Sequence, residues 1–536
     1  MITMVAEWDM INCRMKTNNR KIVIATFLLL MPLTMMGGRW NDSLEYRVEF
    51  QSTLSSGYTP LWLNANRHGL SSMEEENGYL RASLIRPLAL DSLRNWGVGY
   101  GVDVALTHHF TSDWVMQQCY LEGRWLKGTL TIGSKNYPME LKNQELSSGS
   151  QTFGINARPI PQVRLALPDY WTIPLLNGWM QMKGYMSFGW MTDNQWQRDF
   201  TQCTTKYTQN TLYHAKAGYL RIGKAGKPLS VELGLEMAVT FGGCSYRPAN
   251  DGTMIKEVNG SGLDSYWKAF IPGGSDVNER DYRNVMGNQL GSWLMRINYE
   301  CSSWGLHVYA DKYFEDHSSM FMLDYDGYGK GDEWNERKEN RYFLYSLSDM
   351  MLGVELNLKR CRAVRNVVVE YLYTKYQSGP IYHDHTPSMS DHISGRDNYY
   401  NHGLFTGWQH WGQVMGNPLY RSPLYNKDGR IEVQNNRFVA WHFGASGALL
   451  PHVDYRLLAT FQDGFGTYSN PYSRRQYNRS WLMELAWRIP TRKSGNWLLS
   501  GAYGIDRGGI LGNNHGFQFT IAREGILSRH RSSPSR

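Results

Sequence analysis

The chain has 536 residues, of which 13% are aromatic, 53 are glycine and only 19% are charged, and its formal net charge is +8. Its mean hydropathy is negative, which indicates that apolar residues alternate with polar ones instead of gathering in blocks. The many aromatic and β-branched residues exclude a disordered protein.

The N-terminal segment has the parts of a secretory signal peptide. Four basic residues at positions 14–21 precede a short apolar core at 22–31, and Gly37 and Gly38 follow. The core is shorter than the ~20 residues of a membrane helix, which disfavours an anchor. We therefore expect residues 1–40 to hold a signal peptide, preceded by an extension that a start at Met15 would omit. Export makes nucleic acid a poor partner for the surplus positive charge, and an acidic glycan or a lipid phosphate suits it better.

Residues 96–110 give the clearest strand pattern of the chain. Apolar side chains at every second position, beginning with Trp96, alternate with glycine, alanine and polar residues. Such alternation predicts a strand with one apolar and one polar face. Strands in soluble sandwiches are usually about 5–6 residues long, whereas strands of about ten residues with aromatic ends are typical of a transmembrane β-barrel.

The same alternation recurs to the C-terminus. In chain order it predicts 18 strands, roughly at residues 44–51, 78–89, 96–110, 114–124, 129–136, 161–168, 179–191, 212–222, 229–241, 291–301, 304–314, 349–358, 365–376, 437–448, 454–462, 479–489, 496–506 and 514–523. The polar faces carry Glu232, Glu236, Glu300, Glu355, Glu370 and Glu484. A dry sandwich core could not hold these carboxylates unpaired. We interpret them as a hydrated network in a wet lumen, in preference to catalytic pairs.

The connections alternate between short turns and long segments. The long segments lie near residues 137–160, 192–211, 242–290, 315–348, 377–436 and 463–478. Short turns on one side and long loops on the other are the outer-membrane arrangement, and an even strand number places both termini in the periplasm. The fold expected is therefore all-β: a transmembrane antiparallel barrel over residues 41–526 with long extracellular loops, followed by a basic tail at 527–536.

Four groups of residues resemble motifs of the Wzi-type capsule assembly family. They are residues 59–66 (TPLWLNAN), residues 156–161 (NARPIP) with 168–170 (PDY), residues 398–403 (NYYNHG) and residues 416–419 (GNPL). The resemblance covers nearly all of the mature chain. It implies an 18-stranded outer-membrane barrel, not an enzyme, that binds capsular polysaccharide and helps to hold it at the cell surface.

Two features qualify this resemblance. Enterobacterial members carry a helical periplasmic region before the barrel, whereas strand-like sequence here begins almost directly after the signal, so the resemblance does not extend to functions of that region. Within the second motif, Asn156, Arg158, Pro159 and Pro161 are interpreted as structural, with Arg158 pinning a turn.

The long loop at 377–436 is richest in side chains suited to sugars. The glycan-binding candidates are Tyr399, Tyr400, His402, Trp408, Trp411 and Arg421, and lesser ones are residues 266–268, Tyr328, Trp334 and Arg337. Aromatic faces pack against the C–H faces of sugar rings, and arginine binds carboxylate or phosphate with two hydrogen bonds. The alternative is that these residues pack the loop on itself or plug the lumen.

No metal or cofactor is expected. Residues 383–385 with His392, and residues 324–327 with 332–333, offer possible ligands but match no defined site. Cys203 and Cys244 fall in predicted loops and could pair.

Three function classes follow from these observations. The leading hypothesis is a non-enzymatic barrel with capsular or other acidic surface polysaccharide and outer-membrane lipid as partners. A diffusion porin would share the barrel but needs an open pore. An outer-membrane hydrolase needs a nucleophile and a histidine on facing strand ends, which the sequence does not provide in recognisable form.

Overall fold

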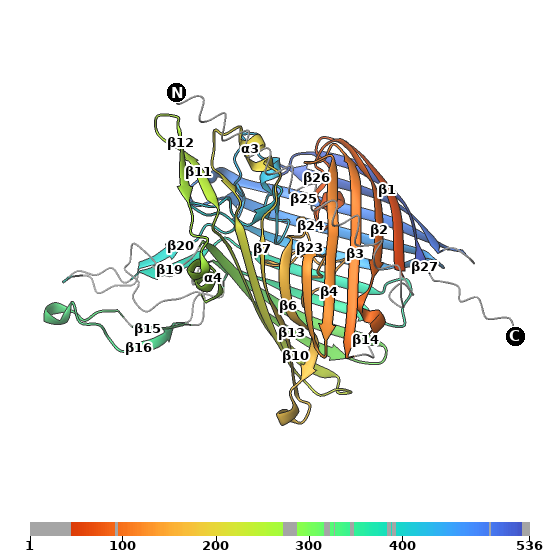
Figure 1. Cartoon of the computed structure of the whole chain (residues 1–536), viewed down its shortest axis with the longest axis horizontal. Helices are drawn as coiled ribbons and strands as arrows, with labels where there is room; N and C mark the ends of the chain where they lie inside the picture. Colours follow the sequence, from red (N-terminus) through yellow and green to blue (C-terminus); the bar gives the residue numbers. More distant parts are fainter. Residues whose placement is uncertain are drawn as a thin grey trace.

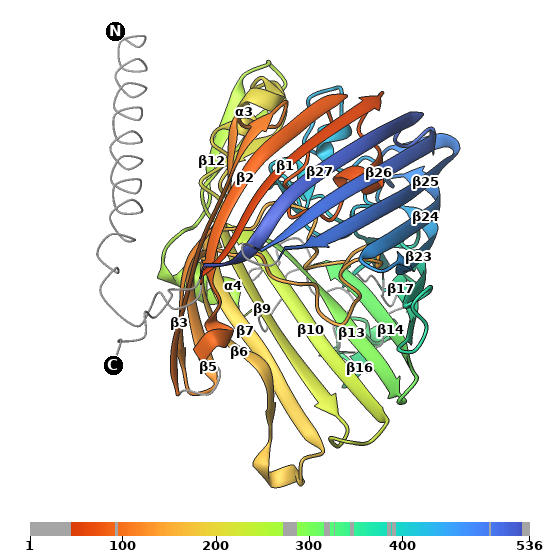
Figure 2. The same cartoon turned by 90° about the vertical axis from the view of Figure 1, so that its right-hand side faces the viewer.

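The computed structural model describes residues 44–91, 95–271, 287–315, 322–325, 327–343, 348–382, 387–388, 393–491 and 495–527. These residues form a closed barrel of 18 antiparallel strands (Figures 1 and 2). β1 (Leu44–Ser56) closes the ring by pairing with both β2 (Glu76–Arg86) and β27 (Asn514–Leu527). The expected signal peptide and residues 528–536 of the expected tail lie outside the described residues.

The other barrel strands follow one another around the wall in chain order. They are β3 (Trp96–His108), β4 (Trp114–Trp125), β5 (Gly128–Ser134), β6 (Gln162–Thr172), β7 (Met180–Trp190), β9 (Leu212–Ile222), β10 (Leu229–Phe241), β13 (Asn288–Glu300), β14 (Trp304–Glu315), β17 (Met350–Leu358), β18 (Asn366–Tyr373), β23 (Phe438–Leu450), β24 (Val453–Gly466), β25 (Pro471–Pro490) and β26 (Asn496–Gly508). The strand number and order expected from the alternation are confirmed.

One predicted loop is wrong. β24 and β25 continue to pair past Gly464 and Gln476 and, after a register shift, as far as Gly466 and Pro471, so residues 463–478 are mostly the end of a hairpin. This part of the hairpin carries Arg474, Arg475 and other polar residues. It therefore lacks the apolar face by which the membrane strands were recognised, although the backbone pairing is the same.

The outer wall is apolar. Side chains such as Phe50, Leu80 and Leu165 point outward and are exposed. Exposed tryptophans mark the two ends of the band: Trp96, Trp125, Trp179 and Trp304 near the short turns, and Trp114 and Trp190 near the opposite end. An apolar band between two aromatic girdles is the lipid-facing surface of an outer-membrane barrel.

Smaller elements lie in the connections. They are α2 (Leu61–Asn64), α3 (Trp196–Thr201), β8 (Tyr207–Gln209), β11 (Cys244–Pro248), β12 (Met254–Val258), α4 (Leu263–Phe270), β15 (Met322–Tyr325), β16 (Asn340–Phe343), β19 (Ser378–Tyr382), β20 (Ile393–Arg396), β21 (Gln409–His410), β22 (Gln413–Val414) and the short 3-10 helices η2 (Leu88–Asp91), η3 (Pro174–Leu176), η4 (Gly331–Glu333) and η5 (Pro423–Tyr425). No helix in the described ranges is long and apolar enough to cross a bilayer.

The lumen is filled by the chain itself. Segments 57–75, 135–161 and 397–436, which we call the plug, fold inward from the long-loop end. Plug residues such as Trp62, Leu146 and Tyr400 form one buried core with wall residues such as Leu458 and Leu482. The core of the molecule therefore lies inside the barrel.

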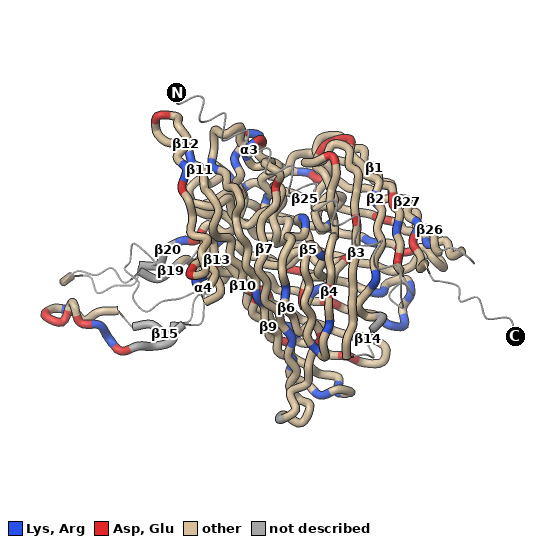
Figure 3. The backbone as a smooth tube through the Cα atoms, viewed as in Figure 1, with Lys and Arg blue, Asp and Glu red and all other residues tan. Residues whose placement is uncertain are grey.

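Four of the six inner-face carboxylates are buried, which differs from the hydrated network that the sequence suggested. Charged residues occur along the strands as well as in the loops (Figure 3), and Glu232, Glu236, Glu355 and Glu370 are buried. Arg296 pairs with Glu355 at 2.9 Å, and the Tyr219 hydroxyl donates to Glu236 at 2.7 Å. Because the plug displaces solvent, these carboxylates need protein partners.

Candidate functional site

The sequence motifs meet where the three plug segments join. Asn156 accepts a hydrogen bond from the amide of Asn66 at 3.1 Å and donates from Nδ2 to the carbonyl of Val414 at 2.9 Å. The amide of Gly154 also donates to the carbonyl of Met415 at 3.0 Å. One buried asparagine thus links all three segments, which agrees with a structural role for this motif.

Arg158 fastens the same junction to the barrel rim. Its guanidinium donates to Thr111 Oγ1 at 2.7 Å and Ser112 Oγ at 3.0 Å, in the β3–β4 turn, and its central carbon lies 4.2 Å from the ring centroid of Trp411. Burial lowers the pKa of Arg158 to about 10. Gly69 has a φ of +69° and lies against Arg158, where a Cβ would clash with the arginine backbone. The predicted turn-pinning role is therefore a clamp between turn and plug.

Pro159 and Pro161 complete this motif at the start of the wall. The carbonyl of Pro161 accepts a hydrogen bond from the amide of Trp190 at 3.2 Å, and β6 begins at the next residue. Proline has no amide to donate to a neighbouring strand, which suits the point where the chain leaves the plug and enters the sheet.

Buried carboxylates of the wall hold the plug from outside. Asp311 of β14 pairs with Lys142 at 2.7 Å and accepts from the amide of Gln151 at 3.0 Å. Glu370 of β18 accepts from the Ser147 hydroxyl at 2.6 Å and from the amide of Ser148 at 2.8 Å. Hydrogen bonds to ionised groups are roughly twice as strong as neutral ones, so these contacts favour a closed plug.

Three of the glycan candidates lie in the plug interior. Tyr399, Tyr400 and Trp408 are almost completely buried. The Tyr400 ring stacks on Tyr420 at a centroid distance of 4.0 Å, and Trp408 Nε1 donates to the carbonyl of Thr152 at 2.9 Å. Side chains without exposed surface offer nothing to an external sugar, so the structure favours the alternative that they plug the lumen.

The remaining candidates are partly exposed, but their side chains already contact other residues of the protein. His402 Nδ1 accepts from the amides of Leu404 at 3.0 Å and Phe405 at 3.1 Å. Burial, with the nearby cation of Lys206, lowers its pKa to about 4, so the ring is neutral. Arg421 donates to the carbonyl of Tyr425 at 2.6 Å and to Gln434 in the same segment, and to the carbonyl of Ile510 in the β26–β27 turn. Trp411 covers Arg158. All three organise the loop.

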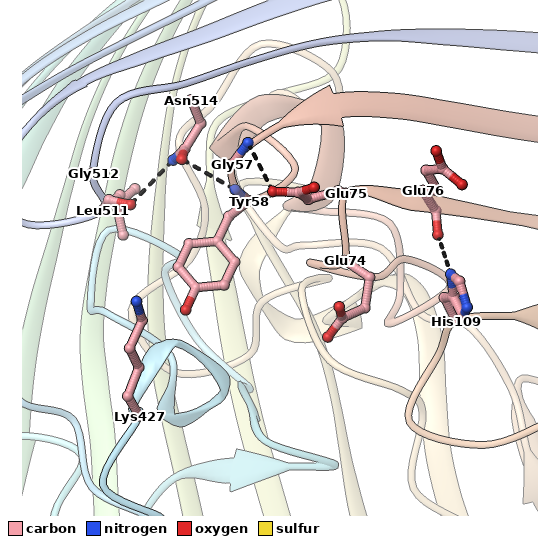
Figure 4. Close-up of a pocket in the computed structure, with 10 residues that line it drawn as sticks. All are labelled: Gly57, Tyr58, Glu74, Glu75, Glu76, His109, Lys427, Leu511, Gly512 and Asn514. Carbon is pink, nitrogen blue, oxygen red and sulfur yellow. Dashed lines mark hydrogen bonds between the residues drawn. The ribbon is translucent and has the colours of Figure 1, made fainter.

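A recess at the outer surface of the plug is lined by polar groups, several of which hydrogen-bond to one another (Figure 4). Its volume is about 640 Å³, and it is lined by Gly57, Tyr58, Glu74, Glu75, Glu76, His109, Lys427, Leu511, Gly512 and Asn514. The Tyr58 ring lies between Glu74 and Lys427 in Figure 4, with Lys427 Nζ 5.9 Å from its centroid. Asn514 Oδ1 accepts the amide of Tyr58 at 3.1 Å and so fixes the tyrosine backbone.

This recess combines an aromatic face, carboxylates and an ammonium group, which are the groups that bind sugar hydroxyls and rings. Sequence reasoning missed it because its residues come from four connections that are far apart along the chain. The motif at residues 59–66 was the nearest signal, since it begins beside Tyr58.

A second cavity of about 460 Å³ lies between the plug and the short turns. Glu140, Lys142, Lys183, Arg221, Glu232, Arg296 and Glu300 are among its lining residues. Several of these charges are paired, including Lys183 with Glu140 and Arg221 with Glu232, both at 2.5 Å. The first pair joins the wall to the plug, and the second joins the adjacent wall strands β9 and β10.

The sequence also suggested a disulfide and possible metal ligands. Cys203 and Cys244 are both free thiols, so the suggested pairing is absent. Within the described ranges no group of three or more His, Cys, Asp or Glu side chains could hold a metal. Residues 383–385 and His392 lie outside those ranges, as does Asp326.

No protein-family model and no curated protein sequence matches the chain. A solved structure that it resembles is Wzi of Escherichia coli, described as an outer membrane protein involved in group 1 capsule assembly and a carbohydrate-binding β-barrel. The TM-score is 0.54 at 12% identity, over 92% of this chain and 87% of that one. OprD of Pseudomonas aeruginosa matches with a TM-score of 0.42 at 9% identity, over 91% and 95%. At these identities the likeness concerns the fold: the chain is a closed β-barrel of the outer-membrane type.

Proposed function

We propose that the protein is a non-enzymatic outer-membrane barrel that binds capsular or another surface polysaccharide and helps to attach it to the cell. The observation that carries the proposal is the plug. Its motif-bearing segments close the lumen and present a rigid recess on the long-loop side. The neighbour Wzi, whose description names capsule assembly and carbohydrate binding, has the same fold.

The recess suggests which part of a glycan it would hold. Tyr58 offers a ring face, Glu74 to Glu76 accept hydrogen bonds from hydroxyl groups, and Lys427 can donate. Three carboxylates against one ammonium group favour a neutral, hydroxyl-rich sugar unit at this point. Acidic units of the same chain would then contact other, basic parts of the loops.

The test is the ratio of cell-bound to shed polysaccharide in a strain lacking the gene. We expect unchanged total polysaccharide and a larger shed fraction, which the wild-type gene restores. Tyr58→Ala should restore attachment poorly, whereas Tyr477→Ala, which removes an exposed tyrosine on β25 outside the recess, should restore it fully. An unchanged ratio in the deletion strain would refute the attachment role.

The alternative of a diffusion porin predicts a different measurement. A plug packed into the lumen leaves no reason to expect steady ion flow. We therefore expect wild-type protein in planar bilayers to show no stable open channel, and a large constant conductance would instead support the porin.

A further inference from the structure

The lipid-facing side of β9 contains two polar residues that break the alternation. His214 and Lys216 point outward with Leu212, since Tyr213 and Ala215 face the lumen core. His214 pairs with Phe188 of β7, and Lys216 pairs with Met186. A lysine or arginine on the lipid face costs up to about 2–4 kcal/mol near the membrane midplane, so this position needs cover.

Helix α4 provides that cover from outside the barrel (Figure 1). His214 is fully buried, with its ring stacked 4.3 Å from Phe188 and edge-on to Phe270 at 5.7 Å. Lys216 Nζ donates to the carbonyl of Phe270, at the C-terminus of α4. This satisfies an end carbonyl of the helix and places a cation at the negative end of its dipole.

The neighbouring strand confirms where α4 lies. Val239 and Phe241 of β10 share the outward face of its lipid-facing residues, yet they are buried because Tyr266 and Ala269 pack on them. The helix is thus fastened by apolar packing and by the Lys216 hydrogen bond to the outer wall of three adjacent strands. It replaces part of the wall's own apolar surface.

Within the described residues, the opposite side of α4 is uncovered and exposes large apolar side chains beside the Asp264–Lys268 ion pair. Leu263 is 90% exposed, Trp267 62% and Ile271 48%. Leu263 and Trp267 are four residues apart and lie on one side of the helix, and Ile271 follows directly after its last residue. A row of large apolar side chains on an aqueous loop would be unfavourable. Here the row adjoins the outer wall, where Trp190 of the aromatic girdle is also exposed.

We propose that α4 belongs to the lipid-facing surface of the barrel, with acyl chains of the outer leaflet packed on Leu263, Trp267 and Ile271. The helix would substitute for strand surface that His214 and Lys216 make polar. The proposal rests on continuity of this row with the lipid-facing wall, and it does not depend on the glycan-binding role.

Photo-crosslinking of the full chain tests it. The probe is p-benzoylphenylalanine, incorporated at position 267 or 263 in protein reconstituted into vesicles of phosphatidylethanolamine and lipopolysaccharide. Position 233 is the positive control, because Leu233 is an exposed outward residue of β10. Position 333 is the negative control, because Glu333 lies exposed in the β14–β17 connection.

We expect lipid adducts at positions 267 and 263 with yields within about threefold of the yield at position 233. The yield at position 333 should be at least tenfold below the yield at position 233. Adducts to a second copy of the chain, or no adduct at either helix position while 233 reacts, would overturn the proposal. Heat-dependent mobility of each labelled protein on a gel verifies that the barrel is folded, and two helix positions guard against failure of one.

Discussion

Lys142 Nζ lies 2.7 Å from a carboxylate oxygen of Asp311, and neither side chain is exposed to solvent. The lysine belongs to the plug and the aspartate to the wall strand β14. A buried ion pair adds little stability over an apolar pair, but removal of one partner leaves a buried charge. While the plug is closed, each of these two charges therefore requires the other.

We predict that Lys142→Met destabilises the closed plug by about 3–5 kcal/mol. Channel recordings should show openings absent from the wild type, and proteases should cut the plug faster. Adding Asp311→Asn should recover most of the closure, because the remaining charge is removed while the amide of Gln151 keeps an acceptor. Lys183→Met is the matched control: its pair with Glu140 is partly exposed and should be worth less than about 1 kcal/mol.

Asn156 gives a second prediction. Asn156→Ala removes the link between the three plug segments and leaves the Asn66 amide and the Val414 carbonyl without that partner. Each unsatisfied buried group costs about 1–3 kcal/mol. Amide hydrogen exchange at residues 64–70 and 412–416 should accelerate by at least tenfold, while exchange in the β24–β25 hairpin stays unchanged. Uniform acceleration over the whole barrel would contradict a local role.

The barrel could be predicted from the sequence because its physical cause is local. Alternation of side chains over about ten residues is fixed by strand geometry, so strands such as β3 and β10 are visible one at a time. The plug could not be predicted in this way. Aromatic residues in a loop, such as Trp408 and Tyr399, are equally compatible with sugar binding and with packing inside the lumen. Only the contacts between distant segments distinguish these two roles.

The exceptions to the alternation were informative, although their meaning was not evident in advance. His214 and Lys216 on the apolar side of β9 imply a covering element, and α4 supplies it. Likewise, Glu370 on an inner face requires a hydrogen-bond partner. The sequence suggested water in this role, whereas in the structure the partners are Ser147 and Ser148. In both cases a strand carries a polar residue that requires a partner or a cover, and a segment distant in the sequence provides it.

Arg421 was selected as a glycan contact, but its contacts predict a structural effect. Its guanidinium joins the carbonyls of Tyr425 and Ile510 and the amide oxygen of Gln434. Arg421→Lys keeps the charge but not this branched geometry. We expect it to loosen residues 421–434 as measured by limited proteolysis, about as much as Arg421→Ala does. Full rescue by lysine would contradict this structural role of the guanidinium group.

The last prediction concerns pH. His410 lies in the plug with Nδ1 2.9 Å from the carbonyl oxygen of Arg158, while the amide of Thr192 donates to Nε2 at 3.2 Å. Burial, assisted by the cation of Arg158, lowers its pKa to about 4 and outweighs the hydrogen bonds to the Arg158 and Thr192 carbonyls, which raise it. A neutral imidazole has one N–H, so it can donate to only one of the two carbonyl oxygens that face the ring nitrogens, that of Arg158 at 2.9 Å or that of Thr192 at 2.7 Å.

A folded pKa below the unfolded value of about 6.5 means that the opened plug binds the proton more tightly. The stabilisation is therefore complete above about pH 7 and is lost as pH falls from 6.5 toward 4. At ~1.4 kcal/mol per pKa unit, the loss approaches 3 kcal/mol for His410. Proteolysis of the plug should thus accelerate between pH 7.5 and 5, and His410→Gln, which retains one donor and one acceptor, should flatten this dependence. An equally steep dependence in the variant would assign the effect to other groups, of which His402 has a similarly lowered pKa.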